Sequence, residues 1–93
     1  MKLNWSTSYK RSYIKIIIKN PALGSKIIST MSKIEIDPLM PELKTHKLKG
    51  VLDGSWACAV DYDIRIIFDF VRNKTSGESE ILLLDIGTHE QVY

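Results

Sequence analysis

The 93-residue sequence lacks most features that mark secreted, membrane or metal-binding proteins. Its single cysteine, Cys58, excludes an intrachain disulfide and a four-thiolate metal site. Its apolar runs span only a few residues, whereas a helix that crosses a bilayer needs roughly 18 or more. The N-terminal stretch MKLNWSTSYKRSY contains no apolar segment of a secretory signal. We therefore expect a cytoplasmic protein that does not associate with membranes.

Familiar catalytic motifs are absent as well. The sequence contains no GxGxxG, P-loop, HExxH, GxSxG or CxxC pattern. Dinucleotide-binding enzymes, P-loop NTPases, zinc proteases and serine hydrolases are thereby disfavoured. We expect a function that needs no cofactor and no metal.

The composition is that of an ordinary globular protein, with 44% hydrophobic and 26% charged residues. A chain of this length has room for one core, so we expect a single domain over residues 1–93. The net charge of +2 is too small to indicate a strongly basic nucleic-acid-binding domain. However, most basic residues lie in the first half and most acidic residues in the second, which allows a local positive face.

Residues 8–19 are predicted to form an amphipathic helix, which the side-chain oxygen of Ser6 or Thr7 can cap. The apolar residues at helical spacing are Tyr9, Tyr13, Ile16 and Ile17. The basic residues on the opposite arc are Arg11, Lys15 and Lys19. Asn20 and Pro21 then suit the cap and first position of a second helix, which ends before Asp37–Pro38. Its apolar stripe consists of Leu23, Ile27, Met31 and Ile34.

The remainder of the sequence is typical of strands. Leu3–Trp5 is short enough to be an edge strand, and β-branched or aromatic runs follow a loop in the second half. These runs are Val51–Leu52, Trp56–Val60, Ile64–Val71 and Ile81–Ile86. Alternation in the third run places only apolar residues on one face, and this face should carry the helices. We predict an α+β fold in which an N-terminal helical hairpin packs on a small, mainly antiparallel β-sheet.

The other face of this sheet is expected to collect polar groups. The candidates are His46, Asp61, Asp63, Arg65, His89 and Tyr93. Imidazoles and carboxylates can accept and donate protons, and a guanidinium can stabilise charge, so such a cluster suits phosphoryl transfer without a metal.

Each candidate also has a structural interpretation. His46 can be a solvated loop residue, and the two aspartates fit turn positions for backbone reasons alone. Arg65 can form an ion pair with Asp69 or Asp85. Trp56 is better interpreted as core, and Cys58 between two alanines as a small buried hydrophobe.

Two stretches decide between these interpretations. The segments HKLKGVLDGSWACAVDYDIRIIFDF and ILLLDIGTHEQVY resemble the RelE/YafQ family of toxins from prokaryotic toxin–antitoxin systems in order and spacing. With the helical hairpin, the resemblance covers essentially the whole chain. It implies a compact fold of two N-terminal helices and a small antiparallel sheet. It also implies a ribosome-dependent endoribonuclease that cuts mRNA in the ribosomal A site and is inactivated by a partner antitoxin.

The resemblance assigns the site residue by residue. His89 matches the catalytic histidine of YafQ-like members, where RelE has an arginine, and Tyr93 matches the terminal aromatic residue. Arg65 matches the strand arginine of RelE. His46 matches the YafQ-like histidine before the L-x-G step, and Asp63 matches the acid beside the next strand.

The chain also departs from the family pattern. The strand lysines of RelE have no counterpart around Trp56–Val60, and Asp61 or Tyr62 stands roughly where YafQ has a mid-sheet histidine. His46, Asp61 and Asp63 thus all remain candidates for the general base.

The implied reaction is attack by the RNA's own 2′-OH, which gives a 2′,3′-cyclic phosphate and a 5′-OH. His46 or Asp63 would help remove the 2′-proton, and Arg65 would stabilise the phosphate. His89 would protonate the leaving oxygen, and Tyr93 would orient the nucleotide. The residues expected to bind ribosomal RNA are Arg11, Lys15, Lys19, Lys44, Lys47 and Lys49. The alternatives are a non-catalytic module that binds an antitoxin or RNA, and a ribonuclease that needs no ribosome.

Overall fold

The computed structural model describes residues 1–92 of the chain. The helices are α1 (Thr7–Lys19), α2 (Leu23–Ile36) and the short α3 (His89–Val92), and two 3₁₀ turns, η1 (Pro41–Leu43) and η2 (Gly50–Leu52), lie in the middle of the chain. The strands are β1 (Leu3–Trp5), β2 (His46–Lys47), β3 (Trp56–Ala59), β4 (Ile64–Arg72) and β5 (Ser79–Thr88). No helix within residues 1–92 is long and apolar enough to cross a membrane.

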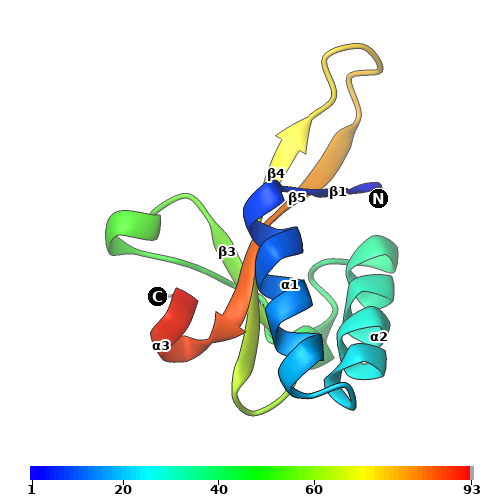
Figure 1. The fold of residues 1–93 in the computed structure, drawn as a ribbon. Coiled ribbons are helices and arrows are strands. Elements are labelled where there is room, and N and C mark those ends of the chain that lie inside the picture. The colour runs from blue at the N-terminus through cyan, green and yellow to red at the C-terminus, as the bar shows by residue number, and fades with distance from the viewer. Residues whose placement is uncertain (93) are drawn as a thin grey trace.

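The strands form one sheet in the order β1-β5-β4-β3-β2. Edge strand β1 pairs with β5 in parallel, and every other neighbouring pair is antiparallel. Figure 1 shows α1 and α2 on one side of this sheet, and α3 with the η2 segment on the other. The predicted α+β fold, with a helical hairpin on a mainly antiparallel sheet, is confirmed.

Helix α1 begins at Thr7, one residue earlier than predicted, and Ser6, one of the two predicted caps, is its N-cap. The side-chain oxygen of Ser6 accepts a hydrogen bond from the Tyr9 N–H at 3.0 Å, which satisfies one backbone donor of the first turn. The same hydroxyl donates to the Leu84 carbonyl at 3.1 Å. Ser6 therefore caps the helix and fastens its start to β5.

The start of α2 differs from the prediction. Asn20 and Pro21 do not begin this helix, because Asn20 ends α1 by donating its N–H to the Ile16 carbonyl. The chain then turns, and α2 begins at Leu23 with Ala22 as its N-cap and no side-chain cap. The predicted apolar stripe is otherwise correct, since Ile27, Met31 and Ile34 are all buried.

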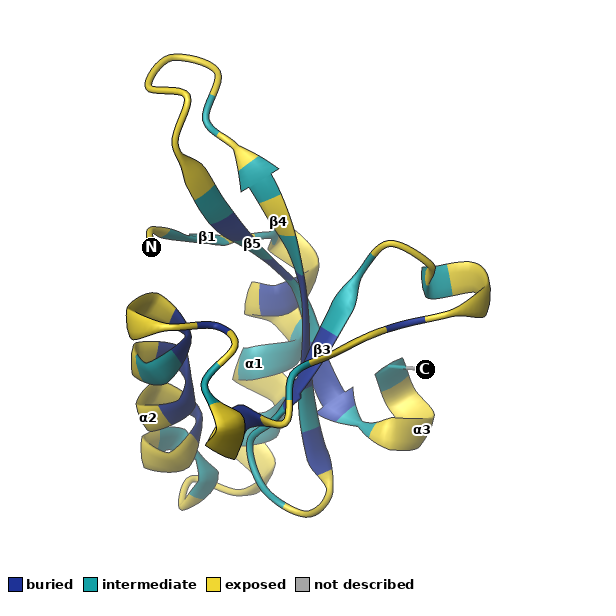
Figure 2. Ribbon diagram, turned by 180° about the vertical axis from the view of Figure 1, so that it is seen from behind, coloured by how far each residue is buried: buried dark blue, intermediate teal, exposed yellow. Residues whose placement is uncertain are grey.

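Alternation along β4 divides the apolar residues between the two faces of the sheet. Ile64, Ile66 and Phe68 belong to the main core under the helices, as expected. Ile67 points the other way, into a small second cluster with Leu48, Ala57 and the partly buried Leu52, Leu84 and Val92. Figure 2 shows buried residues where β4 and β5 cross the middle of the molecule, and exposed ones at their hairpin tip and on α3.

Three predictions for the second half need correction. Val51–Leu52 is not a strand but part of η2, because Gly50 at φ 76° starts a turn there. The strand that precedes β3 is instead β2, so His46 lies on a sheet edge and not in a loop. β5 is longer than predicted, and the residues after it form α3.

The dual role of Ser6 yields the first prediction. Ser6→Ala removes both the helix cap and the bond to β5, and should lower the free energy of unfolding by about 1–2 kcal/mol. Urea-induced unfolding measures this, with Ser8→Ala as the matched control because Ser8 is an exposed residue of the same helix. An equal loss in the two variants would contradict the assignment of Ser6 as the cap.

Candidate functional site

Strand register brings two of the predicted site residues onto the face opposite α1 and α2. His46 pairs with Ala57, and Ala57 with Ile67. Directly opposed residues of antiparallel strands project to the same side, so His46 shares the face of the small Ile67 cluster. Arg65 lies two residues before Ile67 and therefore emerges on this face as well.

The turn between β3 and β4 is organised by Asp61. Its Oδ1 accepts hydrogen bonds from the N–H groups of Asp63 at 2.9 Å and Ile64 at 2.8 Å. Lys26 of α2 approaches the other carboxylate oxygen at 4.0 Å. Partial burial alone would raise the pKa of Asp61, but the two N–H donors, with Lys26 and Arg65 nearby, lower it overall. A carboxylate held in this way is a weak proton acceptor, so Asp61 serves the turn and not base catalysis.

Arg65 is held by the same turn. Its Nη1 donates to the backbone carbonyl of Asp61 at 2.7 Å and to that of Ile64 at 3.2 Å. The ion pairs with Asp69 or Asp85 considered above do not form, since the ion pairs among residues 1–92 are Lys26–Asp61 and Lys33–Glu42. The guanidinium of Arg65 is thus held by neutral carbonyls. Within residues 1–92 it forms no ion pair with a carboxylate.

His46 is oriented by a neighbouring carbonyl. Its Nδ1 lies 3.1 Å from the Lys44 carbonyl oxygen. Because a carbonyl oxygen only accepts, Nδ1 is the donor in this contact, which fixes the orientation of the ring.

His89 is placed by a tight turn at the end of β5. Thr88 and Gln91 form a reciprocal cap, in which the Thr88 N–H donates to Gln91 Oε1 at 2.9 Å and the Gln91 N–H to Thr88 Oγ1 at 3.3 Å. The helix α3 that follows packs back on Gly87, where an added Cβ would lie 2.8 Å from Gln91 Oε1 and 3.1 Å from Val92 Cγ1. Gly87 therefore gives α3 the space to place His89 beside the sheet.

Two open hollows flank the Asp61–Ile64 turn. The first, of about 490 Å³, is lined by Glu42, Lys44, Ala59, Val60, Asp61, Tyr62 and Arg65, and we call it the Arg65 hollow. The second, of about 570 Å³, is lined by Asp63, Thr88, His89 and Glu90, and we call it the His89 hollow. A predicted acid and a predicted histidine thus share one hollow, and the predicted arginine lies in the other. Tyr93 is outside the described residues.

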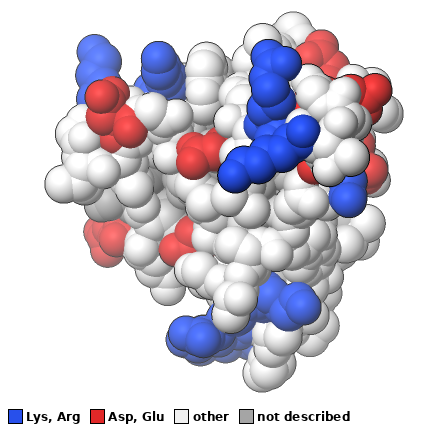
Figure 3. Space-filling view, turned by 90° about the horizontal axis from the view of Figure 1, so that it is seen from above, with Lys and Arg blue, Asp and Glu red and all other residues white. Residues whose placement is uncertain are grey.

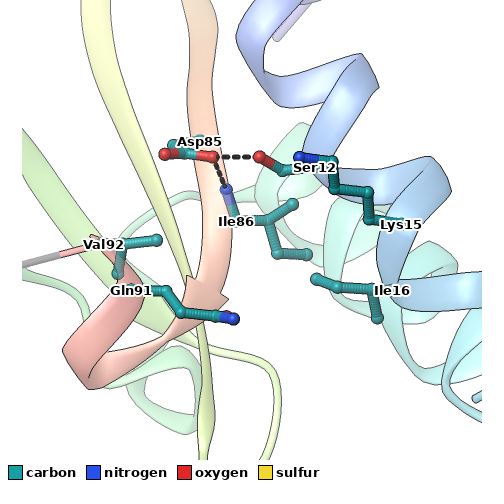
Figure 4. A pocket seen from close by; sticks show the side chains of 7 residues that line it. All are labelled: Ser12, Lys15, Ile16, Asp85, Ile86, Gln91 and Val92. Carbon is teal, nitrogen blue, oxygen red and sulfur yellow. Dashed lines mark hydrogen bonds between the residues drawn. The ribbon is translucent and has the colours of Figure 1, made fainter. Parts of the chain in front are cut away.

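A further pocket of about 190 Å³ lies between α1 and α3 (Figure 4). On its wall, the Ser12 hydroxyl donates to Asp85 Oδ1 at 2.6 Å, and the same oxygen accepts the Ile86 N–H at 2.9 Å. The Asp85 carboxylate thus joins α1 to β5 near a register shift between Ile67 and Phe68. Asp85 therefore has a structural role. Its carboxylate is directed toward Ser12 of α1, so it does not pair with Arg65.

The basic residues expected to bind RNA fall into two groups. Arg11, Lys15 and Lys19 are exposed on α1, while Lys44, Lys47 and Lys49 are exposed on and around β2. Figure 3 shows Lys and Arg side chains in separate groups, with uncharged and acidic surface between them. The exposed face of α1 is also less polar than predicted, because Ile14 and Ile18 are 46% and 73% exposed there.

Neither a cysteine nucleophile nor a metal site is found among the described residues. Cys58 is fully buried, as the sequence indicated, and burial raises the pKa of its thiol to about 12, which makes it a poor nucleophile. Within residues 1–92, His, Cys, Asp and Glu side chains do not gather in a group that could hold a metal ion.

The packing of α3 on Gly87 can be tested by substitution. Gly87→Ala places a methyl group against Gln91 and Val92, so it should displace α3 and lower the free energy of unfolding by about 1–3 kcal/mol. NMR should show a shifted His89 imidazole resonance, and urea unfolding gives the energy. Gly24→Ala is the matched control, because its Cβ would lie 3.9 Å from Ile17 in a helix and should stabilise by up to about 1 kcal/mol. An unchanged His89 resonance in Gly87→Ala would contradict this account.

Comparison with known proteins supports the resemblance. The whole chain, residues 1–93, matches the family described as bacterial toxin of type II toxin–antitoxin system, YafQ. YafQ from E. coli strain BL21(DE3) superposes with a TM-score of 0.78 at 17% identity, over 99% of this chain and 97% of that chain. A YoeB/ParE toxin from Agrobacterium tumefaciens gives 0.76 at 20% identity, over 96% and 99%.

A chain of the E. coli DinJ–YafQ toxin–antitoxin complex gives a TM-score of 0.70 at 21% identity, over 99% of this chain and 96% of that chain. No curated protein sequence matches this one. The match to the family covers residues 1–93 and therefore decides the family membership, and the fold agrees with it. The chain belongs to the YafQ family of bacterial toxins of type II toxin–antitoxin systems.

Proposed function

We propose that this toxin is a metal-independent endoribonuclease that cleaves mRNA in the ribosomal A site. The observation that carries the proposal is the shared His89 hollow, where Asp63 and His89 lie beside the turn that also holds Arg65. A carboxylate, an imidazole and a fixed guanidinium are the proton acceptor, proton donor and charge stabiliser that RNA cleavage requires.

These three groups account for every proton transfer in the proposed reaction. The ribose 2′-oxygen attacks the adjacent phosphorus while the Asp63 carboxylate accepts the 2′-proton. The bond from phosphorus to the 5′-oxygen then breaks, and protonated His89 donates its proton to that oxygen. The products are a 2′,3′-cyclic phosphate and a 5′-OH. Arg65 stabilises the additional negative charge on the phosphate oxygens through the N–H donors that its Nη1 bonds leave available.

Asp63 is the favoured base among the three candidates. Asp61 is committed to the turn and its pKa is lowered, and His46 lies at the far edge of the sheet on β2. Asp63, in contrast, lines the same hollow as His89. His46 then serves as a second polar contact to RNA on the same face, and Tyr93 as the residue that orients the nucleotide.

An antitoxin partner and the ribosome complete the proposal. The E. coli YafQ of similar fold is known in complex with the antitoxin DinJ, and we propose a cognate antitoxin for this chain too. The net charge of +2 is small for a protein that binds RNA unaided, which favours a ribosome-presented substrate. The competing function is a non-catalytic module that only binds its antitoxin or RNA.

The central role of His89 predicts the outcome of one substitution. His89→Ala should reduce cleavage of mRNA on programmed ribosomes by about 10²–10⁴-fold, because the leaving oxygen loses its proton donor. Primer extension that maps 5′ ends, with and without ribosomes, measures this. Glu90→Gln is the matched control, since Glu90 lines the same hollow without an assigned role.

Three outcomes separate the alternatives. Cuts within A-site codons that require ribosomes and vanish in His89→Ala support the proposal. Cuts on naked RNA would replace it by a general ribonuclease. No cuts at all by the folded wild-type protein would favour the binding module.

The two basic groups predict a dependence on salt. Charge reversal of Arg11, Lys15 and Lys19, or of Lys44, Lys47 and Lys49, should weaken ribosome binding and flatten its salt dependence, because fewer phosphates are neutralised. Sedimentation with ribosomes at several salt concentrations measures both effects. Lys74→Glu in the β4–β5 hairpin is the control. A triple variant that binds as the wild type at moderate salt removes that group from the proposed interface.

A further inference from the structure

One aromatic side chain differs from all others in the described part of the chain. Six aromatic residues form two ring clusters, with ring centroids 5.1–6.4 Å apart in the first and 5.5–5.6 Å apart in the second. The first cluster is Trp5, Tyr9 and Tyr13, and the second is Trp56, Phe68 and Phe70. Tyr62 belongs to neither cluster and is 98% exposed. Its ring therefore makes almost no contribution to the core.

The backbone that carries Tyr62 is firmly held. Tyr62 is the residue between Asp61 and Asp63, and the Asp61 carboxylate accepts the N–H groups of Asp63 and Ile64 on the far side of it. Arg65 donates to the Asp61 carbonyl, and Lys26 of α2 approaches the carboxylate. Hydrogen bonds from Asp63, Ile64 and Arg65 thus hold the turn that carries the exposed ring. Such an arrangement lowers the conformational entropy that a ligand must overcome on binding.

The position of this ring relates it to both hollows. Tyr62 itself lines the Arg65 hollow, and the charged residues that line it too are the cations Lys44 and Arg65 and the acids Glu42 and Asp61. The next residue, Asp63, lines the His89 hollow. The turn that carries Tyr62 therefore borders both hollows.

We propose that Tyr62 is a stacking platform for a nucleobase next to the scissile phosphate. This inference rests on the proposed function and names how the same site would hold its substrate. Unpaired bases of single-stranded RNA bind proteins chiefly by stacking on aromatic rings, while cations neutralise their phosphates. Tyr62 supplies the ring, and Lys44 and Arg65 supply the cations. Because the cations Lys44 and Arg65 line the hollow that Tyr62 borders and suit the phosphates of a nucleic acid, we choose RNA over a protein as the occupant.

The test compares three substitutions of Tyr62 in ribosome-dependent cleavage. Tyr62→Phe keeps the ring and should cleave with kcat/KM within about twofold of the wild type. Tyr62→Leu keeps apolar surface without a π-face, and Tyr62→Ala removes both, so each should lose about tenfold or more in kcat/KM. The loss should appear in KM and leave kcat nearly unchanged, because the residue binds and does no chemistry. Val51→Ala, at a fully exposed apolar residue in η2, is the control.

A second measurement does not depend on activity. The His89→Ala protein, bound to programmed ribosomes that carry 5-iodouridine in the A-site codon, should form a photocrosslink that mass spectrometry maps to Tyr62. A crosslink at Tyr62, together with the KM effect, supports stacking. Equal kcat/KM in all three Tyr62 variants, or full activity of Tyr62→Leu, would overturn it while leaving the proposed nuclease intact. A wild-type protein that cleaves no RNA would overturn both.

Discussion

The pairing of Arg65 on β4 with Gly87 on β5 is the constraint on which the rest of the site depends. The ladder fixes Arg65 on the face opposite the helices, and the partner position has no side chain. The chain uses the space above Gly87 to fold α3 back on the sheet, where Gln91 and Val92 lie against this glycine. The Thr88–Gln91 cap then holds the first turn of α3, and His89 lines the same hollow as Asp63. A residue with a larger side chain at this position would separate the groups that the proposed reaction needs.

The two faces of the sheet have different tasks. The face under α1 and α2 carries the main core, and its packing accounts for most of the buried apolar side chains. The opposite face has only the small cluster around Ile67, and β2, η2 and α3 cover it partly. Because few apolar side chains are buried on this face, it can carry polar side chains such as Arg65 and His46 without disrupting the core. Asp61 links the two faces. Its carboxylate lies near Lys26 of α2, and its backbone carbonyl accepts a hydrogen bond from Arg65.

Periodic features of the sequence predicted the fold well. The 3.6-residue pattern around Tyr9 and the alternation from Ile64 to Val71 located α1 and β4, and the polar serine before α1 marked its cap. Short or irregular segments were harder. Val51–Leu52, predicted as a strand, lies in the 3₁₀ turn η2, because a positive φ at Gly50 outweighs the β propensity of the valine. Asn20–Pro21 closes one helix before the next begins, a difference of two residues that local propensity does not resolve.

The site was predictable only in part, because its geometry depends on contacts between distant residues. Alternation placed Arg65 on the correct face, but no local pattern shows that its guanidinium is held by the carbonyls of Asp61 and Ile64. The T-x-x-Q sequence from Thr88 is a capping-box signal that could have predicted α3. The exposure of Tyr62 had no signal in the sequence, since a tyrosine in a short turn is equally compatible with packing on the core.

The chemistry of the product ends shows whether the RNA's own 2′-OH is the nucleophile. An mRNA cleaved on programmed ribosomes is analysed by mass spectrometry, beside the same mRNA with a 2′-deoxy nucleotide at the cleavage site. Attack by the 2′-OH gives a 2′,3′-cyclic phosphate or its 3′-phosphate product next to a 5′-OH, and it leaves the 2′-deoxy substrate uncleaved. A 3′-OH with a 5′-phosphate, or cleavage of the 2′-deoxy substrate at the same position, would contradict it.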